Sequence, residues 1–194
     1  MAEVLQIVTG IDRAAPKRVR DAAVIPLGIA SALRRSKLTA LTIADIEAKP
    51  GGVLIMVRRS KTGPEGDGQI VAVAHERHAL TEPFAALAEW TAVRGSTPGP
   101  LYTSLRNGIL TDEPISGEAV ARMPRSRARA AGLSAVRITG HSLRAVHATT
   151  AALAGVALDR IVLQTRHRRL STLIERYIRP TQALEATSSC DLGL

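Results

Sequence analysis

The chain has 194 residues, and its 26 lysines and arginines outnumber its 17 aspartates and glutamates, which gives a net charge of +9. This length predicts one domain with a sizeable core, and an apolar content of 45% excludes extensive disorder. Aromatic residues make up only 2% of the chain, which argues against base stacking on aromatic side chains. The excess of basic charge favours a polyanionic partner, although a generally arginine-rich composition gives the same balance.

The cysteine content indicates the compartment. Cys190 is the single cysteine, so a disulfide framework and a cysteine-based zinc site are excluded. No apolar run approaches the length of a membrane span, and the first residues lack the layout of a signal peptide. We therefore expect a cytoplasmic protein.

The first third of the chain has helical spacing. Residues 1–8 are amphipathic, and residues 18–33 place apolar side chains at steps of three and four. Pro26 lies inside the second segment and is expected to bend or break that helix.

The middle of the chain favours strands. Residues 42–48, 53–59 and 69–74 are predicted strands, and the glycine-rich residues 60–68 have turn composition. Together they predict a small three-stranded antiparallel sheet with its tip between the last two strands.

The remainder of the chain is predicted to be helical. The expected helices are residues 81–94, 116–131 with a kink at Pro124, 141–154, 157–165 and 171 to about 179. The fold class is therefore mainly α with one small three-stranded antiparallel sheet (α+β).

His141 and Arg144 form the first candidate functional pair. A spacing of three places both side chains on one face near the amino end of a helix, where the helix dipole favours an anion such as phosphate. An ordinary surface pair has the same spacing.

Two further cations are candidates. Arg34 follows an apolar helix, where arginine is often a solvated surface residue, but its guanidinium also suits two phosphate oxygens at once. Lys61 lies at the predicted hairpin tip, either as a solubilising residue or as a flexible proton donor.

Tyr177 follows His167 by ten residues. It has two interpretations: a tyrosine at the edge of the core, or a nucleophile. Because a phenol ionises only near pH 10, a nucleophilic Tyr177 needs neighbouring cations, which Arg34, Lys61, Arg144 and His167 would supply.

The order of these motifs resembles the catalytic domain of the tyrosine recombinases, or phage-type integrases, from residue 18 to residue 194. The matching segments are residues 20–36 for the first arginine box, 59–62 for the lysine turn, 140–144 for the second box, and 164–167 with 176–179 for the third box and nucleophile.

The resemblance implies DNA strand transfer without a metal ion or other cofactor. Tyr177 would attack the scissile phosphodiester, form a 3′-phosphotyrosine bond and release a 5′-hydroxyl. Lys61 would protonate the leaving oxygen, and His141 would assist proton transfer at the tyrosine.

The resemblance implies that the other three residues bind the scissile phosphate. Arg34 and Arg144 would hold the non-bridging oxygens and stabilise the charge of the transition state, and His167 would donate a further hydrogen bond.

The sequence departs from the family pattern in four places. Lys37 stands where an acidic residue is usual, and Arg166 stands where a glycine commonly precedes His167. The interval from His167 to Tyr177 is one residue longer than in many members, and Pro124 interrupts a usually continuous helix.

The resemblance also implies partners and organisation. The expected partner is double-stranded DNA, bound by a homotetramer. Residues 1–180 would be the catalytic domain, and residues 181–194 a tail exchanged between protomers. The amino-terminal DNA-clamping domain of integrases has no counterpart in this sequence.

Three other functions remain open at this stage. They are a type IB topoisomerase-like activity, a non-catalytic DNA-binding relic of the integrase family, and a basic helical RNA-binding protein.

Overall fold

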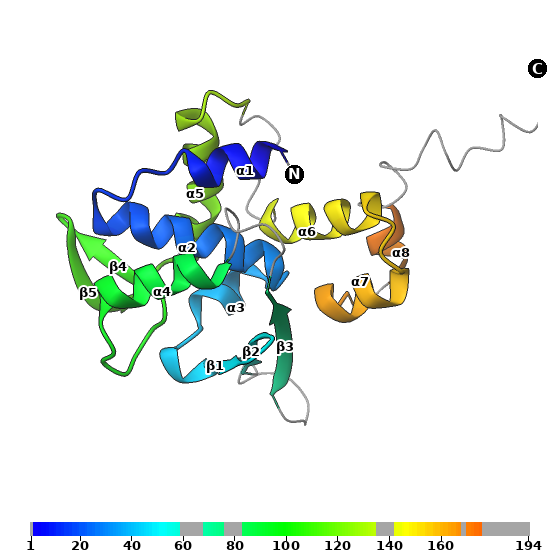
Figure 1. Cartoon of the computed structure of the whole chain (residues 1–194), viewed down its shortest axis with the longest axis horizontal. Helices are drawn as coiled ribbons and strands as arrows, with labels where there is room; N and C mark the ends of the chain where they lie inside the picture. The colour runs from blue at the N-terminus through cyan, green and yellow to red at the C-terminus, as the bar shows by residue number, and fades with distance from the viewer. Residues whose placement is uncertain (1, 59–67, 76–82, 135–141, 168–169, 176–194) are drawn as a thin grey trace, which may run out of the picture.

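The computed structural model describes residues 2–58, 68–75, 83–134, 142–167 and 170–175 (Figure 1). Helix α2 (Pro16–Ala30) lies at the centre and packs against α1 (Ala2–Thr9), α4 (Pro83–Arg94), α5 (Gly117–Ala130) and α6 (Ser142–Leu153). No helix in these ranges is long and apolar enough to cross a membrane.

Burial on all sides explains the continuity of α2. Every residue from Val19 to Gly28 is buried, and the helix continues through Pro26 instead of breaking there. The proline removes one backbone donor from the helix, but packing against four neighbouring helices offsets that loss.

The predicted three-stranded sheet is confirmed. Strands β1 (Ile46–Lys49), β2 (Gly52–Val57) and β3 (Gln69–Ala74) are antiparallel in the order β1-β2-β3. The first strand is shorter than expected, because Ile43–Asp45 forms a 3-10 turn, η1, closed by a capping box between Thr42 and Asp45. The predicted glycine-rich tip between β2 and β3 falls almost wholly outside the described residues.

A second sheet was not predicted. Strands β4 (Thr103–Arg106) and β5 (Ile109–Pro114) form an antiparallel hairpin between the predicted helices 81–94 and 116–131, where the sequence predicted no element. Asn107 and Gly108 both have positive φ, which is the backbone of the tight turns that match strand twist.

The helices in the second half largely agree with the sequence prediction. Helix α5 begins at the cap residue Ser116 and continues through Pro124. Helix α4 places Trp90 in the core, where its indole N–H donates to the Leu101 carbonyl at 2.7 Å.

Helices α6, α7 (Leu158–Thr165) and α8 (Leu170–Leu173) form a lobe on the right of Figure 1. Its own small core consists of Ala148, Ala152, Ile161 and Leu173. Helix α6 packs on α2 and therefore connects this lobe to the main core. The continuation of the predicted last helix beyond residue 175 is outside the described ranges.

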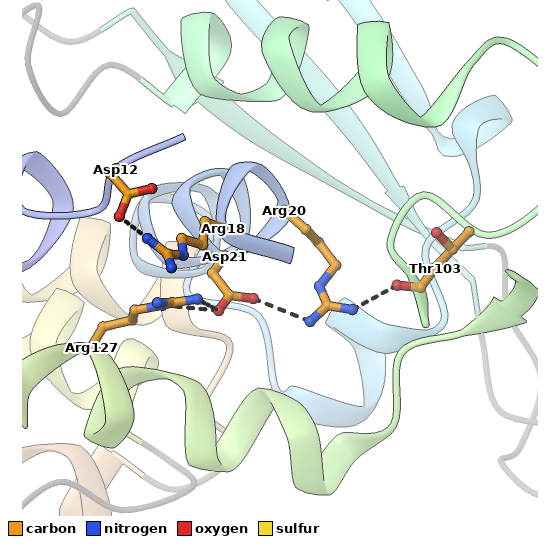
Figure 2. Close-up of polar contacts among 6 residues, drawn as sticks. All are labelled: Asp12, Arg18, Arg20, Asp21, Thr103 and Arg127. Atoms are coloured by element: carbon orange, nitrogen blue, oxygen red, sulfur yellow. Dashed lines mark hydrogen bonds and ion pairs between the residues drawn. The ribbon is translucent and has the colours of Figure 1, made fainter. Parts of the chain in front are cut away.

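A buried polar network, which we call the compensated network, joins α2 to α5 and β4 (Figure 2). The Asp21 carboxylate accepts from the Arg127 Nε at 3.0 Å and from the Arg20 guanidinium at 3.2 Å. Arg20 also donates to the Thr103 carbonyl at 2.9 Å. One buried carboxylate thus pairs with two guanidinium groups and neutralises one of their two positive charges.

Candidate active site

Arg34 lies in a turn between two helices. Helix α2 ends at Ala30, Ala32 has a φ of +49°, and Arg34 is the extended residue before α3 (Arg35–Thr39). The sequence predicted a helix up to residue 33 with Arg34 at its end; the helix ends at Ala30 instead, so the position of Arg34 is corrected to this turn. Arg34 is exposed, which leaves its guanidinium available to a ligand.

Arg144 lies in the first turn of α6 and is only 5% exposed. Its Nη1 donates to the Ala32 carbonyl at 3.0 Å, two residues before Arg34. The two predicted arginines therefore meet at one turn, although 110 residues of sequence separate them.

Two more side chains from the α6–α8 lobe hold the same turn. The His147 Nδ1 donates to the Ile29 carbonyl at 2.9 Å, and the Gln164 Nε2 donates to the Ala30 carbonyl at 2.9 Å. The last carbonyls of a helix lack partners within the helix and carry partial negative charge. They are thus suitable acceptors for groups that fix this turn.

The hydrogen bonds of His167 define its tautomer. The Thr165 hydroxyl donates to the Ile161 carbonyl at 2.6 Å, so its proton is already engaged. The His167 Nδ1, at 2.9 Å from that hydroxyl oxygen, must therefore be the donor. In the neutral ring, Nε2 then carries the lone pair and accepts hydrogen bonds.

The charges around His167 are positive. Burial, then the charge of Arg144 and then that of Arg34, lower the pKa of His167 to about 4. The imidazole is therefore neutral at pH 7 in the free protein. It donates from Nε2 only when it is protonated, and a nearby anion would favour that protonation.

Arg166 adds to this positive region. It ends α7 with a φ of 52° and a ψ of 45°, the left-handed conformation that favours glycine. Burial, and then the charge of Arg34, lower the pKa of Arg166. We call Arg34, Arg144, Arg166 and His167 the cationic cluster.

Lys37 contacts the base of the segment that follows β2. Its Nζ donates to the Arg58 carbonyl at 2.7 Å, and the Arg58 Nε bonds the Asp45 carboxylate at 2.6 Å. The lysine found in place of the usual acidic residue thus connects α3 to the start of the connection that contains Lys61.

Three of the six predicted site residues are described, and three are not. Arg34, Arg144 and His167 come together, whereas Lys61, His141 and Tyr177 lie outside the described residues. The other tyrosine, Tyr102, is fully buried, and its hydroxyl donates to the Ala23 carbonyl at 3.3 Å. Burial raises the pKa of Tyr102, which disfavours the phenolate that a nucleophile requires.

A family model described as "Phage integrase family" matches residues 1–183. An integrase/recombinase xerD homolog from Selenomonas ruminantium is 33% identical over 161 residues. The chain belongs to the phage integrase family. The match covers 82% of this chain and 47% of that relative, so the chain spans about half of the relative's length.

Solved structures of integrase family members share the fold. The XerA recombinase superposes with a TM-score of 0.72 at 20% identity, over 96% of this chain and 62% of that one. The XerH recombinase bound to its difH substrate gives 0.68 at 20% identity, over 94% and 49%. A lambda integrase fragment, a dimer bound to a core site, gives 0.62 at 20% identity, over 91% and 57%.

The sequence reasoning assigned no role to His147, Gln164 or Thr165. Each of these residues acts through a carbonyl or hydroxyl brought close by the fold, so the contacts have no local sequence signature. The one signal available was that Gln164 and Thr165 are the first two residues of the third-box segment, residues 164–167.

Proposed function

We propose that this chain is an integrase catalytic domain that cuts and rejoins double-stranded DNA through a tyrosine–phosphate intermediate. The observation that carries the proposal is that Arg34, Arg144 and His167 come together, so that the charges of both arginines lower the pKa of the histidine. Such a cluster suits a phosphodiester, because its positive field stabilises the extra negative charge of a pentacoordinate transition state.

One phosphorus–oxygen bond forms as another breaks, so the reaction needs no external energy source. The Tyr177 Oη forms a bond to phosphorus while the bond from phosphorus to the 5′-oxygen breaks. The phenol proton passes to solvent water with the assistance of His141, and Lys61 gives a proton to the leaving 5′-oxygen. Rejoining runs the same steps in reverse.

His167 would change its protonation state on binding. In the free chain its Nδ1 donates to Thr165 and its Nε2 carries a lone pair. A bound phosphate adds negative charge beside the ring and raises the pKa of His167. The protonated Nε2 then donates to a phosphate oxygen.

The test uses nicked duplexes with a randomised core, so no target site needs to be known. After cleavage the short fragment diffuses away, and the protein stays attached to the remaining DNA. Wild-type protein without divalent metal is expected to give an adduct that survives denaturation. Sequencing of the captured DNA then identifies the preferred site.

Three variants check the roles. Tyr177→Phe is expected to bind DNA and to give no adduct, whereas Tyr102→Phe, the matched control, gives the wild-type adduct. Arg34→Ala is expected to slow adduct formation by about 10²–10³-fold through lost charge stabilisation. An adduct that persists in Tyr177→Phe, or DNA binding with no adduct from wild type, would contradict the proposal.

A further inference from the structure

Gln164 contacts two elements besides its own helix. Its Nε2 donates to the Ala30 carbonyl at the end of α2 and to the Ala72 carbonyl on β3, at 2.9 and 3.1 Å. A carboxamide nitrogen has two N–H donors, and both neighbours are carbonyls that only accept. The orientation of the amide is therefore fixed by its partners.

These two contacts join the elements that carry the site. The α2 carbonyl belongs to the turn before Arg34, and α7 leads directly into Arg166 and His167. Strand β3 follows the connection that contains Lys61 and pairs with β2 through Val57 and Gln69 at that end.

We propose that Gln164 is a positioning residue that sets the β2–β3 sheet, from which the connection containing Lys61 extends, against residues 31–34, which we call the arginine turn. The inference rests on the proposed function of Lys61 as the proton donor to the leaving oxygen. In this role Gln164 acts through its bonds to Ala30 and Ala72 and not on the reacting atoms.

The two hydrogen bonds of Gln164 differ in whether other contacts remain when they are lost. When Gln164 is changed, the arginine turn keeps its bonds from Arg144 to Ala32 and from His147 to Ile29. The bond from α7 to β3 is lost. Loss of Gln164 therefore affects protonation of the leaving group more than it affects phosphate binding by the arginines.

The variants remove the donors without changing side-chain length much. Gln164→Met has no donor, and Gln164→Glu places an acceptor against two carbonyls. Gln6 supplies the matched control, because its Nε2 donates to the Ala131 carbonyl at 2.9 Å and joins α1 to α5. Gln6→Met thus loses a similar bond in a different part of the fold.

The decisive readout compares two DNA substrates. One is the nicked duplex captured by wild-type protein, and the other has sulfur in place of the bridging 5′-oxygen at the scissile phosphate. A thiolate is a far weaker base than an alkoxide, so the sulfur leaves without a donated proton. A decrease in cleavage rate that is caused by a misplaced Lys61 is therefore expected to disappear with this substrate.

Gln164→Met is expected to slow single-turnover cleavage of the ordinary duplex about 10- to 100-fold, and Gln164→Glu at least as much. With the sulfur substrate, both are expected to cleave at near the wild-type rate. DNA affinity is expected to change little, and Gln6→Met to cleave both substrates normally. Equal slowing on both substrates, or no slowing, would overturn the inference.

Hydrogen exchange provides a readout that does not depend on the reaction. Without DNA, Gln164→Met is expected to speed amide exchange in residues 68–75, and Gln6→Met to leave it unchanged. Wild-type protein that forms no adduct refutes the proposed function alone. Unchanged exchange in Gln164→Met refutes the positioning role, whether or not wild type forms an adduct.

Discussion

The compensated network and the cationic cluster both gather arginines around α2, but their charges are balanced differently. In the network, Asp21 accepts from Arg20 and Arg127. In the cluster, the charges that act on His167 come from Arg144 and Arg34, and both lower its pKa. The first arrangement pairs two cations with a carboxylate, whereas the charges that shift the pKa of His167 are positive and favour an anion beside it.

Neutral carbonyl groups anchor the turn that leads to Arg34. Carbonyls at the end of α2 and in the following turn accept from Arg144, His147 and Gln164. These dipoles stabilise nearby positive charge without cancelling it, unlike a carboxylate. These contacts thus fix the turn before Arg34 without placing a negative charge there, which suits the binding of a phosphate.

Asp21→Asn breaks the compensated network and gives the largest expected effect. The buried Arg20 and the partly buried Arg127 lose their shared counter-charge, so we expect the free energy of unfolding to fall by about 3–5 kcal/mol in urea titration. The control is Asp12→Asn, because Asp12 pairs with Arg18 at an exposed position (Figure 2). That variant is expected to lose about 0–1 kcal/mol. Equal losses in the two variants would remove the distinction between buried and exposed pairs.

Arg166→Gly tests the cationic cluster. Glycine adopts the left-handed backbone of this position without strain and removes a cation repelled by Arg34, so we expect a gain of about 1 kcal/mol in unfolding free energy. Arg166→Ala removes the charge but keeps the β-carbon, which separates the two contributions.

Asn107→Gly is the backbone control for Arg166→Gly. Asn107 also has a φ of 52°, but asparagine tolerates that conformation, so this change is expected to be nearly neutral. Thermal or urea unfolding of the three variants suffices. A lower unfolding free energy in Arg166→Gly would contradict this expectation. It would show that contacts of the Arg166 side chain stabilise the fold by more than backbone strain and repulsion from Arg34 destabilise it.

Local patterns predicted most of the fold, with the β4–β5 hairpin as the main exception. Helical spacing indicated α2, and β-forming runs indicated the strands of the first sheet. The β4–β5 hairpin was missed although Asn107 and Gly108 are a strong turn signal, because the flanking residues alternate weakly.

The candidate site shows the same division. The order of the motifs predicted that Arg34, Arg144 and His167 lie together. The lowering of the His167 pKa by both arginines agrees with that grouping. The contact of Gln164 with Ala30 spans 134 positions, and that of Arg127 with Asp21 spans 106. Such contacts depend on how whole elements pack, so neither residue has a local pattern that reveals its role.

The pKa of His167, measured by NMR with labelled histidine, tests the central claim that the cationic cluster holds a DNA phosphate. In the free chain we predict a value of about 4, well below the ordinary 6.5. With a saturating duplex captured in the adduct experiment, bound by Tyr177→Phe so that no cleavage follows, we predict a rise of about one to three units. His147, whose Nδ1 donates to the Ile29 carbonyl, serves as the internal control and is expected to shift less. A free value near 6.5, or a pKa of His167 unchanged by bound DNA, would contradict the account.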